Sequence, residues 1–145
     1  MTLASLLDFA RANLLLSLAL LGLTLAIIYH EISRLFLGFK AVHPAALTEL
    51  INRKDALVVD VSATGDFEKG HIVGSRNVVM SQFDPENKAL ANVRELPVVL
   101  VCRTGTVSAQ AAKRLVKAGF KHVFWLDGGI AAWQQADLPL LKGKS

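Results

Sequence analysis

Hydrophobic residues divide the chain into two parts with different patterns. Between Ala12 and Tyr29 no charged residue interrupts a run rich in leucine, alanine and isoleucine, which is apolar on every side of a helix. After residue 39, short β-branched runs alternate with segments in which apolar residues recur at helical spacing. We therefore expect a membrane anchor in residues 1–38 and a separate folded domain in residues 39–145.

The first part has the length of a membrane span. With about 1.5 Å of rise per residue, residues 12–29 make roughly 27 Å of helix, close to the thickness of the bilayer hydrocarbon. Arg11 precedes the run, and the polar and interfacial residues 29–34 follow it. The pattern predicts one N-terminal transmembrane helix, about residues 12–29, in contact with membrane lipid. The apolar residues 35–39 are expected at the membrane interface.

Two other interpretations of the hydrophobic run are weaker. A cleaved signal peptide would have a basic start and a small-residue cleavage site, whereas this run begins after Asp8 and a single Arg11 and ends in His30 and Glu31. A buried core helix would need a larger surrounding domain. Positive charges lean slightly towards the C-terminal side, at Arg34 and beyond, so a single-pass protein of the inner (plasma) membrane with a cytoplasmic domain is favoured.

The second part alternates strand and helix patterns. Continuous β-branched runs are typical of strands buried on both faces, and they occur at Ala56–Val61, Pro97–Cys102 and His122–Leu126. A shorter strand is indicated around residues 71–72 and 77–79. Helices are predicted from Pro44, over Ala109–Ala118 with Ser108 as N-cap, and over Ile130–Gln135. This order predicts an α/β fold with a mainly parallel central sheet flanked by helices.

Composition limits the chemistry. Sixteen Lys and Arg against 12 Asp and Glu give a net charge of +4 without a long charged run, so a solvated basic surface is favoured over a nucleic-acid site. A single cysteine excludes an intrachain disulfide, and no Cys/His cluster indicates zinc. We expect no metal, no cofactor and no nucleic-acid partner. An unpaired thiol also fits a reducing compartment.

The single cysteine stands where ligands bind in open α/β sheets. Cys102 ends a predicted buried strand directly before a helix. The loop from Arg103 to Ser108 contains a glycine and small hydroxyl residues, so its backbone N–H groups and the helix N-terminus favour an anion there. A thiolate in such a loop is a competent nucleophile. The alternative is a small apolar residue that fills the core.

Other polar residues near this strand edge are candidates of lower rank. Asp60 ends a neighbouring strand and either supports the loop or caps the strand. His71 suits a structural role better than that of a general base. Trp125 and Trp133 are expected to serve in packing. The residues predicted to contact a substrate are Arg103, Thr104, Gly105, Thr106, Val107 and Ser108.

Several segments resemble motifs of the rhodanese family, and they occur in the same order along the chain. The matching segments, which span about residues 41–141, are Val59-Asp60-Val61, Gly70-His71-Ile72-Val73-Gly74-Ser75 with Asn77, Cys102 to Ser108, Ala118-Gly119-Phe120, Leu126 to Ile130 with Trp133, and Leu138-Pro139. The anchored arrangement resembles bacterial membrane-bound single-domain rhodanese-like proteins. The resemblance implies a rhodanese-like fold and sulfurtransferase activity.

In this family the cysteine is a sulfur carrier. The resemblance implies that Cys102 takes a sulfane sulfur from a small donor such as thiosulfate, or from a protein persulfide, and passes it to a thiol acceptor by a two-step exchange. The loop from Cys102 to Val107 has the six-residue length associated with sulfur substrates. Phosphatase relatives of the fold use a loop one residue longer, so phosphatase chemistry is disfavoured.

Two positions depart from the family pattern. Ser62 and Val107 stand where the family often has arginine, and valine cannot grip an anion as a guanidinium does. Because these two cations are missing, we expect thiosulfate to be a poor donor. Arg103 is a candidate to compensate for their absence. The alternative function is a catalytically weak or inactive module that recruits protein partners at the membrane, including a membrane protein.

Overall fold

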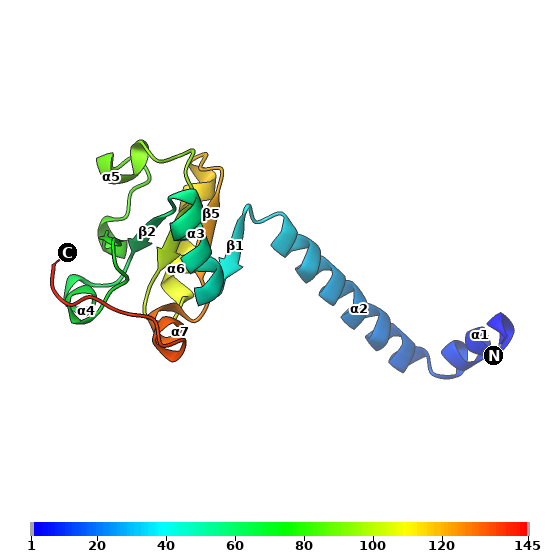
Figure 1. Cartoon of the computed structure of the whole chain (residues 1–145). Coiled ribbons are helices and arrows are strands. Elements are labelled where there is room, and N and C mark those ends of the chain that lie inside the picture. The colour runs from blue at the N-terminus through cyan, green and yellow to red at the C-terminus, as the bar shows by residue number, and fades with distance from the viewer. Residues whose placement is uncertain (1, 145) are drawn as a thin grey trace. The chain divides into compact units, whose positions relative to one another are not determined.

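The chain forms two compact units. The structure is a computed structural model that describes residues 2–144, and it divides into Met1–Leu37 and Gly38–Ser145 (Figure 1). Each unit has its own secondary structure, and the candidate site lies within the second.

The first unit consists of two helices, α1 (Leu3–Ala12) and α2 (Leu14–Leu35). The sequence pattern did not predict α1, whose N-cap Thr2 accepts a hydrogen bond from the backbone N–H of Ser5. Asn13 ends α1, since its side chain and its backbone N–H both donate to the carbonyl of Phe9. The long helix therefore begins at residue 14 instead of 12, and it runs past residue 29 to Leu35.

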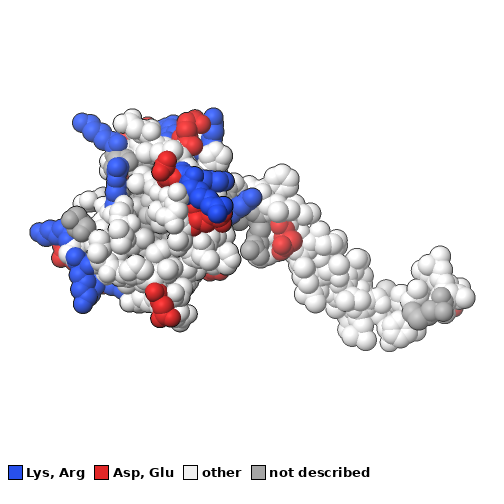
Figure 2. Space-filling model, viewed as in Figure 1, with Lys and Arg blue, Asp and Glu red and all other residues white. Residues whose placement is uncertain are grey.

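Helix α2 is long and apolar enough to cross a membrane. Its segment Leu14–Ser33 has a mean hydropathy of 1.9, and none of the segment is buried within the structure. The middle of the helix carries neither acidic nor basic side chains in the view of Figure 2. In water such a surface would expose large leucine and isoleucine side chains along the whole helix.

A five-stranded parallel sheet forms the centre of the second unit and confirms the predicted α/β class. The strands are β1 (Phe39–Val42), β2 (Leu57–Asp60), β3 (Arg76–Asn77), β4 (Val98–Val101) and β5 (Val123–Leu126). Their order across the sheet is β1-β5-β4-β2-β3, and every pair is parallel. Strand β4 is central and all four of its residues are fully buried.

The two edge strands differ from the expectation. Phe39 was expected at the membrane interface, but it starts β1, pairs with Val123 of β5 and packs against the core. The expectation was wrong because β5 leaves one edge unpaired, and β1 supplies the hydrogen bonds that this edge needs. The short strand predicted around residues 71–79 is only Arg76–Asn77.

Helices cover both faces of the sheet (Figure 1). They are α3 (Pro44–Lys54), α4 (Thr64–Lys69), the 3₁₀ turn η1 (Met80–Gln82), α5 (Lys88–Ala91), α6 (Thr106–Lys117) and α7 (Gly129–Gln135). One core cluster joins Leu100 to Leu115 of α6, and the other joins Val99 to Leu47 of α3 and Trp133 of α7. Alternate residues of β4 therefore fill opposite layers, which is the pattern of a strand between two helical layers.

The start of α6 corrects one prediction. Ser108 was expected to be the N-cap, but the cap is Gly105 with φ of 98°, and the helix begins at Thr106. Ser108 lies in the first turn, where its Oγ donates to the carbonyl of Gly105 at 2.8 Å. The glycine makes the sharp turn into the helix because it accepts a positive φ without steric cost.

Candidate functional site

Cys102 lies at the carboxyl edge of the sheet, directly after β4. Its neighbour across the sheet is the end of β2, where Asp60 pairs with Val101. The side chain is buried, with 4% of its surface exposed. In an open parallel sheet this edge is where loops converge on a ligand.

The loop after Cys102 turns back onto the sulfur. The backbone N–H of Gly105 donates to Sγ of Cys102 at 3.0 Å, and Oγ of Ser108 lies 3.6 Å from the same sulfur. A side chain at residue 105 would meet Trp125 at 2.8 Å, so glycine permits this close approach as well as the positive φ. The sulfur therefore accepts from one amide donor and has one hydroxyl within contact, at the N-terminus of a helix whose dipole favours an anion.

Helix α7 holds the loop from its other side. The carbonyls of Cys102 and Arg103 accept hydrogen bonds from the backbone N–H groups of Ile130 at 3.0 Å and Ala131 at 3.3 Å. Gly129, with φ of 58°, allows the two backbones to approach, because a Cβ there would lie 2.6 Å from the carbonyl oxygen of Arg103. The loop is thus fixed on one side by α7 and contacts the sulfur on the other.

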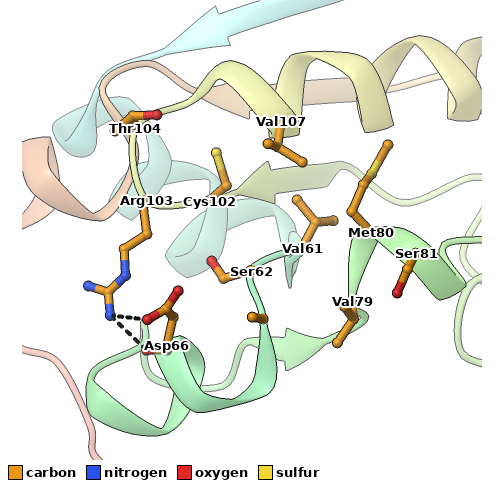
Figure 3. A pocket seen from close by; sticks show the side chains of 11 residues that line it. Val61, Ser62, Asp66, Val79, Met80, Ser81, Cys102, Arg103, Thr104 and Val107 are labelled. Atoms are coloured by element: carbon orange, nitrogen blue, oxygen red, sulfur yellow. Dashed lines mark hydrogen bonds and ion pairs between the residues drawn. The ribbon is translucent and has the colours of Figure 1, made fainter.

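A pocket of about 310 Å³ opens beside the sulfur (Figure 3). Its walls come from the segment after β2, the segment around η1 and the Cys102 loop. The residues that line it are Val61, Ser62, Ala63, Asp66, Val79, Met80, Ser81, Cys102, Arg103, Thr104 and Val107. Four of these are large apolar residues, and only Asp66 and Arg103 are charged.

Arg103 turns away from the sulfur towards α4 (Figure 3). Its Nη2 donates to the backbone oxygen of Asp66 at 3.0 Å and lies 3.7 Å from the carboxylate of the same residue. The sequence left open whether Arg103 compensates for the missing arginines. In the structure its charge is paired with a carboxylate of the same wall.

The six loop residues predicted to contact substrate divide into two groups. Arg103, Thr104 and Val107 line the pocket, whereas Gly105, Thr106 and Ser108 are not among the lining residues. Gly105 and Ser108 instead contact the sulfur itself.

Sequence reasoning missed most of the opposite wall. Asp66, Val79, Met80 and Ser81 line the pocket but were not proposed as site residues. The available signal was their place after strands β2 and β3, since loops that follow parallel strands meet at one edge of a sheet.

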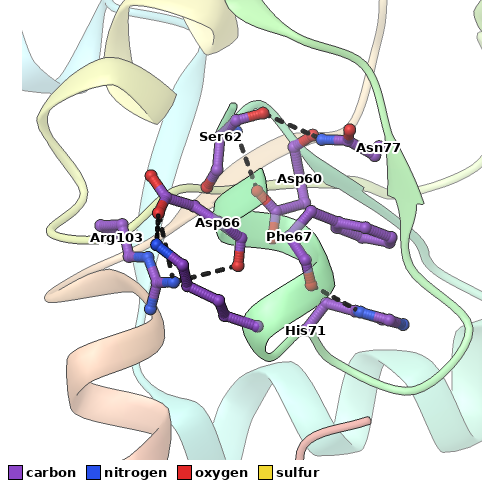
Figure 4. Close-up of polar contacts among 8 residues, drawn as sticks. Asp60, Ser62, Asp66, Phe67, His71, Asn77 and Arg103 are labelled. Carbon is purple, nitrogen blue, oxygen red and sulfur yellow. Dashed lines mark hydrogen bonds and ion pairs between the residues drawn. The ribbon is translucent and has the colours of Figure 1, made fainter. Parts of the chain in front are cut away.

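Asp60 supports this edge without lining the pocket (Figure 4). Its carboxylate accepts the backbone N–H of Ser62 at 2.9 Å, and the amide of Asn77 donates to the carbonyls of Asp60 and Ser62 at 3.0 and 2.9 Å. Burial raises the pKa of Asp60 above its ordinary value of 3.8, and this outweighs the opposing effects of Ser62 and Arg103. The Ser62 hydroxyl is one of the groups that lower the pKa of Asp60, but its Oγ makes no hydrogen bond of regular geometry with a described residue.

His71 lies away from the pocket, among structural contacts. Its ring stacks on Phe67 with 3.8 Å between centroids, and its Nδ1 lies 2.9 Å from the carbonyl of Phe67 (Figure 4). Its backbone exchanges two hydrogen bonds with Leu141. Trp133 is buried and donates from Nε1 to the carbonyl of Pro139, which agrees with the predicted packing role.

The residues that the structure describes do not form a metal site. Between residues 2 and 144, no three His, Cys, Asp or Glu side chains come together in a way that could hold a metal ion. The chemistry that the site can support with its own residues is that of the Cys102 sulfur.

Known proteins are similar in sequence to most of this chain. The rhodanese-like domain family matches residues 43–136. A protein of Escherichia coli K12 called uncharacterized protein YibN is 36% identical over 138 residues, which cover 94% of this chain and 96% of that protein. The thiosulfate sulfurtransferase GlpE of Pseudoalteromonas translucida is 31% identical over 69% of this chain and 93% of its own length.

A solved structure agrees with these matches. The crystal structure of a thiosulfate sulfurtransferase from Pseudomonas aeruginosa superposes with a TM-score of 0.64 and 30% identity. The match covers 73% of this chain and 20% of that one. The fold around the cysteine is therefore shared with a domain of a larger protein.

Proposed function

The chain belongs to the rhodanese-like domain family, and on that premise we propose that it is a sulfurtransferase that carries a sulfane sulfur as a persulfide on Cys102. The observation that carries the proposal is the 3.0 Å contact between the backbone N–H of Gly105 and the sulfur of Cys102, a residue that lines the pocket. A fixed amide donor beside a sulfur favours its anionic form in both stages of such a cycle.

The proposed cycle has two steps. The Cys102 thiolate attacks the outer sulfur of a donor, a new S–S bond forms, and the donor's S–S bond breaks to release a thiolate or sulfite. An acceptor thiolate then attacks the terminal sulfur, becomes a persulfide itself and restores the Cys102 thiolate. No external oxidant is needed, because the sulfur moves at constant oxidation state. The donor leaves before the acceptor enters, so ping-pong kinetics are expected.

We also propose that α2 anchors the chain in the inner membrane by a single pass, with residues 39–145 in the cytoplasm. The support is the apolar length of α2, the slight excess of cations after it, and a lone thiol that suits a reducing compartment. The expected partners are a small donor or a protein persulfide, a thiol acceptor, membrane lipid and a membrane protein. Protease digestion of residues 39–145 in inside-out vesicles, but not in intact spheroplasts, tests the orientation.

Sulfur loading tests the activity directly. The full chain in detergent micelles is reduced and exposed to thiosulfate or to inorganic polysulfide, and intact-mass spectrometry measures the added sulfur. We expect one sulfur atom per chain, removable by cyanide and absent in Cys102→Ser. If the folded protein takes up no sulfur from either donor, the sulfurtransferase proposal fails. A partner-recruiting module then becomes the better account.

A further inference from the structure

We propose that the pocket beside Cys102 selects donors that carry an apolar organic group and at most one negative charge, such as an organic persulfide, over the inorganic dianion thiosulfate. This inference rests on the proposed sulfurtransferase function and specifies its substrate class. It follows from three properties of the pocket: the apolarity of its walls, the pairing of its charges and its size.

The side of the pocket opposite Arg103 carries four large apolar residues beside Ser81 (Figure 3). Val61, Val79, Met80 and Val107 come from three separate segments and line one cavity. Val107 is 37% exposed although it is a large apolar residue, so a ligand that covers it removes apolar surface from water. Thiosulfate offers only oxygen and sulfur atoms to these side chains, whereas an alkyl or aryl group would gain from each contact.

The charged side chains that line the pocket are one cation and one carboxylate, Arg103 and Asp66, and the same carboxylate also binds Lys69 at 3.3 Å outside the lining. The guanidinium of Arg103 is held by the backbone oxygen and the carboxylate of Asp66. No other lining residue carries a charge on its side chain. A dianion would bring two charges next to the Asp66 carboxylate, where the one cation of the lining already bonds to Asp66, and desolvating a charge without a partner is costly. The amide of Gly105 can serve one charge, that of the reacting sulfur.

The neutral polar residues that line the pocket are Ser62, Ser81 and Thr104. Ser62 is nine-tenths buried in the pocket wall, and its hydroxyl makes no hydrogen bond of regular geometry with a described residue. A hydroxyl can donate to a sulfonyl oxygen or accept from a persulfide S–H, but it cannot neutralise a second negative charge.

The size of the cavity suits an organic donor. Its volume of about 310 Å³ reaches the lower end of the range of roughly 300–1,000 Å³ found for sites of small organic ligands. The transfer balances for such donors. With a persulfide RS–SH, the Cys102 thiolate bonds to the outer sulfur and RS⁻ leaves. With a thiosulfonate RSO₂–S⁻, the same bond forms and the sulfinate RSO₂⁻ leaves.

Three donors separate charge from apolar contact. The full chain in detergent micelles is loaded with thiosulfate, methanethiosulfonate anion or benzenethiosulfonate anion, and the rate of sulfur addition to Cys102 is followed by mass spectrometry. Each rate is divided by the rate of the same donor with glutathione in the same micelles. We expect the normalised rate to rise in that order, by about tenfold or more overall. The first step changes the charge, and the second adds only the ring.

Two variants assign the preference to the pocket. Val107→Thr keeps the shape but lowers apolarity, so the benzene donor should lose roughly three- to tenfold of its advantage. Val73→Thr is the matched control, because Val73 is 53% exposed and does not line the pocket. Asp66→Asn removes the negative wall charge and should raise the normalised rate with thiosulfate.

The outcomes distinguish this inference from the proposed function. Equal normalised rates, or the highest rate with thiosulfate, overturn the substrate class while the sulfurtransferase function stands. A preference that Val107→Thr and Val73→Thr change equally also overturns it, since the pocket would not be its source. If none of the three donors loads Cys102 but inorganic polysulfide does, the substrate class is wrong while the proposed function stands. If polysulfide also fails to load it, the proposed function fails, and the inference fails with it.

Discussion

Replacing Gly129 by alanine should loosen the Cys102 loop from α7. Gly129 has φ of 58°, a conformation that costs an alanine about 1–2 kcal/mol. The added Cβ would also clash with the carbonyl oxygens of Cys102 and Arg103, the second at 2.6 Å. Relieving that crowding moves the loop or the helix and costs about 1–3 kcal/mol more. The expected loss of unfolding free energy is therefore about 2–5 kcal/mol.

The chain offers a control that separates the two contributions. Gly119 has φ of 91°, and a Cβ built there has no atom within 4 Å. Gly119→Ala should lose only the conformational part, about 1–2 kcal/mol. Urea unfolding followed by tryptophan fluorescence reports on the correct unit, since Trp125 and Trp133 both lie after residue 38.

The same pair of variants links the loop to chemistry. A misplacement of about 1 Å at a reacting centre costs up to about 100-fold in rate, so Gly129→Ala should slow sulfur loading by about tenfold or more under native conditions. Gly119→Ala should load at the wild-type rate. Equal stability and equal loading in the two variants would refute the argument that the close approach of α7 positions the loop.

Three further substitutions test other parts of the site. Asp60→Asn keeps an oxygen acceptor for the backbone N–H of Ser62. Because burial raises the pKa of Asp60 in the folded state, the wild type should lose unfolding free energy relative to the variant as the pH rises from about 4 through that raised pKa. A difference in urea-unfolding free energy that does not change with pH would contradict this expectation. Asn77→Ala removes two hydrogen bonds to the end of β2 and should cost about 1–3 kcal/mol in the same titration, whereas a change below about 0.5 kcal/mol would argue against that clamp. Val107→Arg places a cation at the pocket, and the loading rate with thiosulfate should rise about tenfold; an unchanged rate would show that charge at this position does not limit the reaction.

Continuous apolar runs made the central strands predictable. Strands β2, β4 and β5 lie within the predicted segments. A strand buried on both faces is a continuous apolar run, and such a run is easily recognised in a sequence. Strand β1 was not predicted, since Phe39–Val42 adjoins the hydrophobic anchor and becomes a strand only through pairing with β5. Its structure depends on a partner more than 80 residues later in the chain.

The position of Cys102 could be predicted from the sequence, but the walls of the pocket beside it could not. Cys102 follows a recognisable strand and precedes a recognisable helix. The direction of Arg103 is set by Asp66, which lies 37 residues earlier in helix α4. The contribution of Met80 depends on the 3₁₀ turn η1, which follows a two-residue strand. Local propensity determines neither of these contacts, because both arise from tertiary packing.

The two edge strands of the sheet are short, which limits edge-to-edge pairing between copies of the domain. Open edges of β-sheets are templates for aggregation, and long flat apolar edges are the most hazardous. Here one edge strand has four residues with Lys40 exposed on it, and the other has two residues with Arg76 exposed. Neighbouring copies that collide edge to edge find few free hydrogen-bonding groups and a cation among them. Each edge of the sheet therefore offers a second copy of the domain only a short ladder with a cation in it.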